Sequence, residues 1–282
     1  MIATLKGRVV MAALAVTAIG LAAVASVILF ATQRGATETL QSDLKQVAQA
    51  NATEISNWAV SKQLVVKSLM PAVTKEDLSN ELAAAQTAGD FDDVYVGYAD
   101  RRATFFQKRQ RAADYDPTKR GWYIGAAKAN GPFISKPYVG AGSKKLTVTF
   151  AAPVNANGTV GAVVAADVLM ESVQKTLAAI RPTSSSLAFL EGADGTVIAH
   201  PNDEAVLKTV DQVFPGVTAG QIDRLSDSGT TGESSRDGRE QTVLVTKVDG
   251  TPWRLVILVD TGEVSLTGIF EPFRDRRNRA TG

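Results

Sequence analysis

A short segment of the chain gathers the residue types that suit binding of a carboxylate. Tyr115, Arg120 and Trp122 follow one another closely around the rigid turn at Pro117, and Gly121 permits an unusual backbone turn before Trp122. A guanidinium held among aromatic rings donates to both oxygens of a carboxylate, and the indole of Trp122 offers a further N–H. The alternative is that Trp122 belongs to the core and that Arg120 is solvated or structurally paired.

Asp167 is the second candidate, because it lies at the end of a nearly continuous apolar strand, residues 163–169. Burying a carboxylate there costs free energy unless a donor or a cation meets it, which favours a role in binding an ammonium group. The alternative is that Asp167 caps the helix expected to begin near Met170. An arginine at one end of a pocket and an aspartate at the other end match a zwitterion.

Composition argues against several other kinds of site. The chain has no cysteine and a single histidine, His200, which rules out thiolate chemistry, a histidine-based catalytic triad and a two-histidine metal site. Lys and Arg number 30 against 29 Asp and Glu, a balance that gives no electrostatic footprint for nucleic acid. Residues 140–145 lack the spacing of a phosphate-binding loop and are typical of a hairpin tip.

We therefore expect a binding protein without a cofactor rather than an enzyme. A membrane-anchored hydrolase is the alternative from another class, but it needs a nucleophile with a neighbouring base, and the sequence offers no such pair.

A long amphipathic helix is expected to begin near Thr37 and to support the rest of the fold. Pro71 ends or interrupts this helix, and a shorter helix is predicted over residues 75–88. The predicted stripe of the long helix follows a spacing of three and four residues and includes two polar positions: Leu40, Leu44, Val47, Asn51, Ile55, Trp58, Lys62, Val65 and Leu69.

Beyond residue 88 the pattern changes to short strands rich in β-branched and aromatic residues, separated by Gly, Asn and Asp turns. A second block of the same kind begins near Ser186, after a joint at residues 182–186. Its last two strands are expected to form a hairpin with a type I′ turn at Asp249-Gly250. The predicted class is α+β, with two antiparallel-sheet modules stacked along the long helix. The predicted strands are 94–98, 146–151, 160–165, 187–190, 196–198, 240–248 and 253–259.

The N-terminal region contains an uncharged stretch, residues 9–31, which exceeds the roughly 20 residues that a membrane-spanning helix needs. A cleaved signal peptide is the alternative, but its apolar segment normally has only about 7–15 residues. Lys6 and Arg8 precede the stretch, so the positive-inside bias places residues 1–8 in the cytoplasm and the rest of the chain outside.

The combined pattern resembles the double-Cache sensor region of bacterial methyl-accepting chemotaxis receptors over about residues 9–260. The resemblance implies connecting helices over 33–88, a membrane-distal ligand-binding module over 89–182, a membrane-proximal module over 183–262 and a C-terminal tail over 263–282. Both modules are then PAS-like. The resemblance rests on Tyr115, Arg120, Trp122, Tyr123, Pro137, Tyr138, Pro153, Val154, Gly161, Asp167 and the stretch from Gly195 to Pro201.

In the amino-acid-binding branch of that family, an arginine and a tryptophan hold the ligand's carboxylate, while tyrosine and aspartate groups hold its ammonium. The resemblance thus implies that Arg120 and Trp122 form the carboxylate subsite, and that Tyr115, Tyr138 and Asp167 complete the site. One position departs from the expected pattern, because Gly140 stands where the family has an aspartate two residues after the tyrosine. This loss weakens the ammonium subsite and leaves a small carboxylate without an amine as an alternative ligand.

The resemblance implies an extracytoplasmic sensor for a small molecule, with an amino acid as the expected ligand. It also implies attachment to the inner membrane and a homodimer formed through the long helix. Because the same outer domain is joined to many outputs, the input region of a sensor histidine kinase or of a diguanylate cyclase is the alternative within signalling.

Overall fold

The computed structural model describes residues 41–156, 158–236 and 238–261. The chain divides into two compact units, Met1–Gln46 and Val47–Gly282, and the fold described below belongs to the second unit. The predicted span over residues 9–31 lies outside the described residues. Within the described ranges, no helix combines the length and the apolar composition that crossing a membrane requires.

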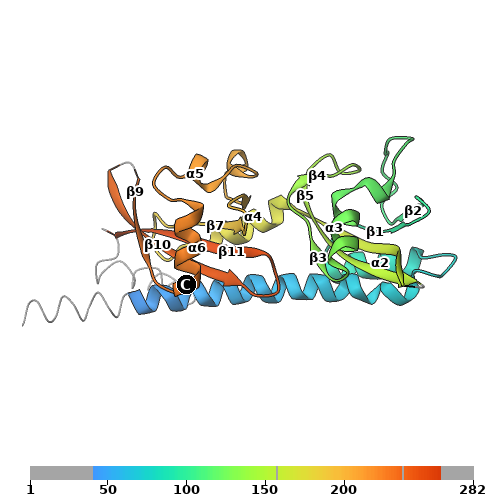
Figure 1. Ribbon diagram of the computed structural model, residues 1–282, viewed down its shortest axis with the longest axis horizontal. Helices are drawn as coiled ribbons and strands as arrows, with labels where there is room; N and C mark the ends of the chain where they lie inside the picture. The colour runs from blue at the N-terminus through green and yellow to red at the C-terminus, as the bar shows by residue number, and fades with distance from the viewer. Residues whose placement is uncertain (1–40, 157, 237, 262–282) are drawn as a thin grey trace, which may run out of the picture. The chain divides into compact units, whose positions relative to one another are not determined.

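Two antiparallel sheets, each covered by helices, follow the long helix in the sequence (Figure 1). The first sheet has the order β2-β1-β6-β5-β3, with β4 also paired to β5, and the second has the order β8-β7-β11-β10-β9. Mixed helices and antiparallel sheets confirm the predicted α+β class. The elements after the long helix are η1 Met70–Ala72, α2 Ser79–Gly89, β1 Asp93–Tyr98, β2 Ala103–Phe105, η2 Pro117–Lys119, α3 Gly121–Ala129, β3 Phe133–Ile134, β4 Tyr138–Val139, β5 Leu146–Ala156, β6 Thr159–Leu169, α4 Met170–Ala179, β7 Leu187–Gly192, β8 Val197–Ala199, η3 Asp203–Ala205, α5 Val210–Val213, α6 Ala219–Ser228, β9 Gly232–Arg236, β10 Arg239–Val248 and β11 Trp253–Asp260.

The long helix extends over residues 41–68 of the described chain. The residues that it buries differ in part from the predicted stripe. Val47, predicted to be in the stripe, is exposed, whereas the alanines beside the predicted positions are buried. An alanine side chain lets a helix approach a sheet closely, so small residues occupy the line of contact and larger ones lie at its edges. In the second unit the buried stripe consists of Ala48, Ala52, Ile55, Ala59, Lys62, Val66 and Leu69.

Trp58 on this helix contacts both sheets. Its ring lies edge-on to Phe150 of β5 at a centroid distance of 5.7 Å and stacks on Trp253 of β11 at 6.5 Å. Two hydrogen bonds add to these contacts. Ser56 Oγ donates to the carbonyl of Asp249, next to β10 of the second sheet, and Gln63 Nε2 donates to the carbonyl of Ala151 in β5 of the first sheet. Residues 47–68 therefore form a common support for the two sheets.

The strands of the first sheet are longer than the sequence predicts, since β5 and β6 each run over 11 residues. In the ladder between β1 and β6, Asp93 faces Asp167 and Gly97 faces Val163. Successive side chains alternate between the two faces of a strand, so Asp93, Tyr95 and Gly97 share one face. That face also carries small residues of β5 and β6 and packs against Trp122 of α3.

The second sheet contains the predicted hairpin, but its turn differs from the prediction. The ladder between β10 and β11 closes at the pair Val248 and Trp253, so four residues, 249–252, connect the strands. Gly250 has a φ of 73°, whereas Asp249 does not have a positive φ. A type I′ turn needs positive φ at both central residues of a two-residue connection, so that prediction is wrong.

A charged pair is buried in the second sheet between neighbouring strands. Glu191 of β7 is fully buried, and Arg254 of β11, which faces it in the ladder, places Nε 2.9 Å from a carboxylate oxygen of Glu191. Burial raises the pKa of Glu191 to about 7, and the neighbouring guanidinium opposes this rise. Arg254 also forms an ion pair with Asp223 of α6, so a shifted strand register would leave Glu191 as the buried charge without a partner.

Candidate ligand-binding site

The five site residues predicted from the sequence line one cavity on the α3 face of the first sheet. They are Tyr115, Arg120, Trp122, Tyr138 and Asp167. The cavity lies among β1, β2, β4, β6 and the start of α3. Figure 1 shows β1, β2, β4 and α3 grouped in the green part of the ribbon. Residues that are far apart in the sequence, such as Tyr115 and Asp167, thus line the same cavity. The zwitterion hypothesis requires this proximity.

Arg120 is held at the junction of η2 and α3. The side chain of Asp116 accepts hydrogen bonds from the backbone N–H of Thr118 at 2.9 Å and from its hydroxyl at 2.6 Å, which fixes the turn that carries Pro117. The Arg120 guanidinium carbon lies 6.0 Å from the ring centre of Tyr115 and 5.9 Å from that of Tyr138. These distances fit cation–π contacts that hold the guanidinium between two rings.

Among the described residues, no carboxylate forms an ion pair with Arg120. Neighbouring arginines differ in this respect, since Arg109 pairs with Asp92 and Arg111 pairs with Asp93. A partly buried guanidinium without an acidic partner has donors available for an incoming anion. The structural ion pair considered for Arg120 in the sequence is therefore not formed within the described part of the chain.

Trp122 belongs to the core, as the alternative interpretation predicted, and it also lines the cavity, where its role in binding a carboxylate stays a prediction. Its side chain is 1% exposed and meets the ring of Tyr95 edge-on at 5.0 Å. Burial raises the pKa of the neighbouring Tyr115 hydroxyl, and a side-chain hydrogen bond with Trp122 works in the opposite direction. Trp122 thus fixes the wall of the cavity and touches its polar lining.

Gly97 of β1 makes room for this arrangement. A Cβ atom at Gly97 would lie 2.6 Å from Trp122 and 2.8 Å from the Cβ of Pro117, which is closer than real Cβ contacts allow. We expect Gly97→Ala to lower the free energy of unfolding by about 1–3 kcal/mol, because Trp122 and the Pro117 turn must shift. Denaturant unfolding measures this loss.

Gly121→Ala is the matched control for that experiment, since nothing lies within 4 Å of a Cβ built at Gly121. At this first position of α3, alanine is expected to change the free energy of unfolding by less than about 1 kcal/mol. Equal effects of the two substitutions would mean that Gly97 is not the residue that accommodates Trp122.

Asp167 is almost fully buried near the end of β6, where its Oδ1 accepts two hydrogen bonds. Tyr95 Oη donates at 2.7 Å and Thr149 Oγ1 donates at 2.7 Å. Helix α4 begins at Met170 with Leu169 as its N-cap residue and no side-chain cap. The helix-capping interpretation of Asp167 is therefore wrong, because its carboxylate points to the neighbouring strands of the sheet.

Tyr138 joins the two ends of the cavity. Its ring faces Arg120, and its hydroxyl lies 2.6 Å from Thr149 Oγ1, the group that donates to Asp167. Burial raises the pKa of Tyr95 and Tyr138 far above the ordinary range, so both phenols stay neutral hydrogen-bond donors. Within the described residues, Asp167 Oδ2 accepts no hydrogen bond, so it is free to accept one from a ligand cation.

Asp167 holds a proton more tightly than an ordinary aspartate. Burial raises its pKa to about 7, an effect that the two hydrogen bonds from Tyr95 and Thr149 only partly offset. Asp93 and Asp92 add to the rise through charge repulsion. A cation bound at this carboxylate would lower its pKa again and bring about release of the proton.

Four further residues line the same cavity and were not predicted from the sequence: Asp93, Tyr95, Phe105 and Arg111. Arg111 Nη2 lies 2.7 Å from Asp93 Oδ2, and the guanidinium stacks 3.3 Å from the ring centre of Phe105. Asp93 directly precedes the strand predicted over 94–98, so its position at a strand start was a signal. Its pairing with Asp167 across the β1–β6 ladder was not visible without the register.

Gly140 lies in the turn between β4 and β5, outside the residues that line the cavity. Its N–H donates to the carbonyl of Lys145, and a Cβ at this position would lie 2.3 Å from Ser143 Oγ. A side chain at this position would therefore require the Ser143 hydroxyl to move. The neighbouring residues Ala141, Gly142 and Ser143 line the cavity instead, so the turn supplies backbone groups and a hydroxyl in place of a carboxylate.

The side chains nearly fill the cavity, whose free volume is about 10 Å³. That volume holds about one water molecule and is far smaller than a typical ligand pocket. Admission of a small molecule therefore requires movement of the lining, which includes the half-buried residues Ala141 and Ser143 of the turn between β4 and β5.

The fold and the cavity define a module of two antiparallel sheets along one helix, with a polar site in the first sheet. Comparison with protein families identifies it: residues 31–267 match the Cache domain model, and the chain belongs to that family. This match confirms the resemblance to the double-Cache family on which the site prediction partly rests.

The curated relatives are methyl-accepting chemotaxis proteins. PscA of Pseudomonas syringae is 29% identical over 182 residues, which cover 63% of this chain and 29% of PscA. McpA of Pseudomonas putida is 28% identical over 236 residues, which cover 79% of this chain and 35% of McpA. The chain thus spans about a third of the length of the relatives it matches.

Solved structures with the same fold are ligand-binding domains of chemoreceptors. The domain of Pseudomonas fluorescens CtaA in complex with L-serine is 25% identical, with a TM-score of 0.70, and the match covers 80% of this chain and 99% of that one. The domain of Pseudomonas aeruginosa PctB in complex with L-Arg has a TM-score of 0.68 at 23% identity, covering 82% and 99% of the two chains.

Proposed function

We propose that the chain is the extracytoplasmic sensor region of a bacterial chemoreceptor and binds an amino acid in the cavity of its first sheet. The observation that carries this proposal is that two ionisable groups of the cavity have no partner of opposite charge among the described residues. Arg120 has no acidic partner among the described residues, and Asp167 lies in the same cavity with no cationic partner there. One unpaired cation and one unpaired carboxyl group are the complement of a zwitterion.

The other two charges of the cavity neutralise one another. Arg111 and Asp93 form an ion pair of largely buried side chains, so they contribute no net charge to the ligand's surroundings. In this arrangement Arg120 and Trp122 bind the ligand's carboxylate, while Asp167 binds its ammonium and Tyr138 lies between the two subsites. Tyr115 forms the aromatic wall beside Arg120.

The relatives support the assignment to chemoreception, and the ligand-binding domains of CtaA and PctB support an amino-acid ligand. We infer further that residues 9–31 anchor the chain in the inner membrane, that the described part lies in the periplasm or outside the cell, and that the long helix forms a homodimer. A histidine kinase or diguanylate cyclase output is the alternative for the whole protein. A small carboxylate or an amine is the alternative ligand, and the replacement of an expected acid by Gly140 favours the carboxylate of these two.

An amino acid that binds the site will stabilise the folded protein. At a concentration 100 times its dissociation constant it adds about 2.7 kcal/mol, which corresponds to a rise of roughly 5–10 °C in the unfolding temperature of a domain of this size. We expect a thermal-unfolding screen to find such a shift with at least one L-amino acid. The matched des-amino carboxylate and decarboxylated amine of that amino acid should give markedly smaller shifts.

Two outcomes would contradict parts of this proposal. A full shift with the des-amino carboxylate would mean that Asp167 is not used and that the ligand is a simple carboxylate. The absence of any shift across amino acids, carboxylates and amines would remove the main support for a sensor of small molecules.

A further inference from the structure

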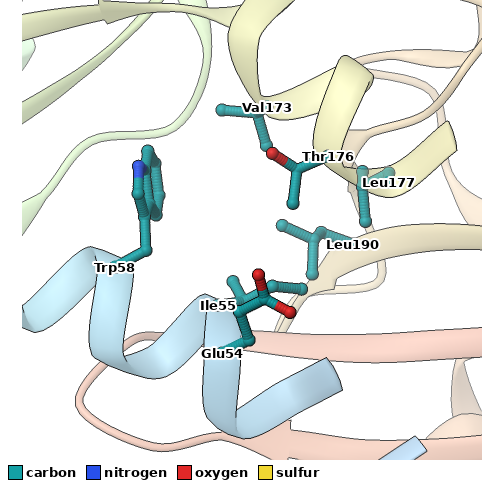
Figure 2. Close-up of a pocket in the computed structure, with 7 residues that line it drawn as sticks. All are labelled: Glu54, Ile55, Trp58, Val173, Thr176, Leu177 and Leu190. Atoms are coloured by element: carbon teal, nitrogen blue, oxygen red, sulfur yellow. The ribbon is translucent and has the colours of Figure 1, made fainter. Parts of the chain in front are cut away.

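A second cavity lies among the long helix, α4 and β7, and the proposed amino-acid site uses none of its residues. It has a free volume of about 100 Å³. Figure 2 shows Ile55 and Trp58 of the long helix, Val173 and Leu177 of α4 and Leu190 of β7 pointing into a common space. Because these three elements meet there, a molecule in the cavity contacts all of them at once.

The apolar part of the lining indicates the kind of alkyl group that a ligand of this cavity would have. Aliphatic side chains and the Trp58 ring surround the space, so burial of hydrocarbon is the available source of affinity. A cavity of about 150 Å³ accommodates benzene, so the smaller space here fits a branched chain of about four or five carbons. Sugars, which need many hydrogen-bond partners, do not match these mainly apolar walls.

The polar end of the ligand follows from Glu54. This exposed carboxylate lies at the edge of the cavity, and Figure 2 shows its oxygens directed toward the enclosed space. Among the described residues it forms no ion pair, unlike Glu81, which pairs with Lys75. Thr176 lies on the opposite wall, where its hydroxyl donates to the carbonyl of Ser172 at 3.4 Å, so the charge at the rim of the cavity is that of Glu54.

We propose that this cavity is a second ligand site, which binds a small primary ammonium compound with a branched alkyl chain. The alkyl chain lies among Ile55, Val173, Leu177 and Leu190, and the ammonium group lies at Glu54. An anionic molecule of the same shape binds more weakly because that carboxylate repels it. The inference goes beyond the amino-acid site, because no residue is shared between the two cavities.

Isoamylamine, which is cationic at neutral pH, is the probe for this site. A ligand of this size is expected to bind with a dissociation constant on the order of 1 mM, a range suited to detection by NMR. The three tryptophans give separate indole N–H signals, and the signal of Trp58 is assigned by its loss in Trp58→Phe. We expect titration to shift the Trp58 signal and to leave Trp122, in the first cavity, unchanged.

The charge requirement is tested by comparing isoamylamine with isoamyl alcohol and isovalerate. The alcohol should bind about fivefold more weakly than the amine, and isovalerate should bind about fivefold more weakly than the alcohol. Glu54→Gln should bring the amine's affinity down to that of the alcohol. The matched control is Glu240→Gln, which removes an exposed carboxylate from β10 that forms no ion pair among the described residues.

A second variant tests the position of the alkyl chain without touching charge. Thr176 is exposed on α4 at the mouth of the cavity, so Thr176→Leu adds bulk there with little risk to folding. This substitution should weaken binding of the amine and of the alcohol to the same degree, because the leucine side chain takes the same space from both ligands.

Three results would overturn the inference. No movement of the Trp58 signal at 20-fold the expected dissociation constant (~20 mM) excludes the site. Equal binding of amine and alcohol in the unmodified protein excludes the ammonium assignment. A shift confined to Trp122 places the amine in the first cavity, which contradicts this inference and leaves the amino-acid site untouched.

Discussion

Replacing Arg120 by alanine is expected to weaken amino-acid binding by about 30-fold or more, the effect of removing one member of a desolvated charge pair. The guanidinium lies between the rings of Tyr115 and Tyr138 and has no acidic partner among the described residues. Its removal therefore takes away the ligand's carboxylate partner and leaves the protein's other ion pairs unchanged. Isothermal calorimetry with the best ligand from the thermal screen measures the change.

Arg120→Lys separates charge from geometry in the same experiment. Lysine keeps the positive charge but loses the planar fork that contacts both carboxylate oxygens, so we expect an affinity between those of the unmodified protein and the alanine variant. Arg224→Ala is the matched control, because Arg224 is an exposed arginine of α6 in the other sheet region. Unchanged binding in folded Arg120→Ala would mean that the carboxylate subsite lies elsewhere.

The site could be predicted where local sequence carries the information. Tyr115, Arg120 and Trp122 lie on one turn and the helix that follows, so their proximity is a consequence of the chain's local path. Asp167 could be identified because a carboxylate in an apolar strand has few stable roles other than binding a donor or a cation.

The residues that were missed depend on contacts between distant segments. Asp93 becomes part of the site only because β1 pairs with β6 in a register that places it opposite Asp167. A shift of β1 by one residue would turn Asp93 to the other face of the sheet, away from Asp167, and the sequence alone does not specify which register forms. Arg111 likewise lines the cavity through its ion pair with Asp93 and its stacking on Phe105, on a segment with no regular structure.

The fold shows the same division between local and distant information. The α+β class and the approximate positions of the main strands followed from periodicity, but the buried stripe of the long helix did so only in part, since Ile55, Lys62 and Leu69 were predicted and the alanines were not. Hydropathy favours large side chains such as Val47, whereas close contact with the sheets selects Ala52 and Ala59. The predicted type I′ turn at Asp249 was wrong for a related reason. Strand pairing ends at Val248 and Trp253, which leaves a connection of four residues instead of two.

Asp167 makes the ligand-free protein less stable at neutral pH. Its folded-state pKa of about 7 lies above its ordinary value of 3.8 because burial disfavours the charged form. The folded state therefore binds the proton more tightly than the unfolded state does. The resulting stabilisation is complete below pH 3.8 and is lost as the pH rises toward 7. A rise of about three pKa units corresponds to about 4 kcal/mol, which is an upper limit for the loss.

Asp167→Asn is expected to reverse this loss and to abolish the ammonium subsite at the same time. Asparagine keeps an oxygen for Tyr95 and Thr149 but carries no charge, so at pH 8 the ligand-free variant should be about 1–4 kcal/mol more stable than the unmodified protein. The gain should shrink toward zero near pH 4, and amino-acid affinity should fall by about 30-fold or more.

Denaturant unfolding of both proteins between pH 4 and pH 8 gives the stability difference directly, and calorimetry gives the affinity. Glu191 also has a pKa raised to about 7, but it is present in both proteins and largely cancels from their difference. Asp249→Asn, in an exposed turn, is the control and should change neither quantity. A destabilised Asp167→Asn at pH 8 would show that the carboxylate is paired in the ligand-free protein. A stabilised variant that still binds amino acids with full affinity would place the ammonium elsewhere. The expected combination of higher stability and lost binding identifies Asp167 as a group whose burial is unfavourable until a cation reaches it.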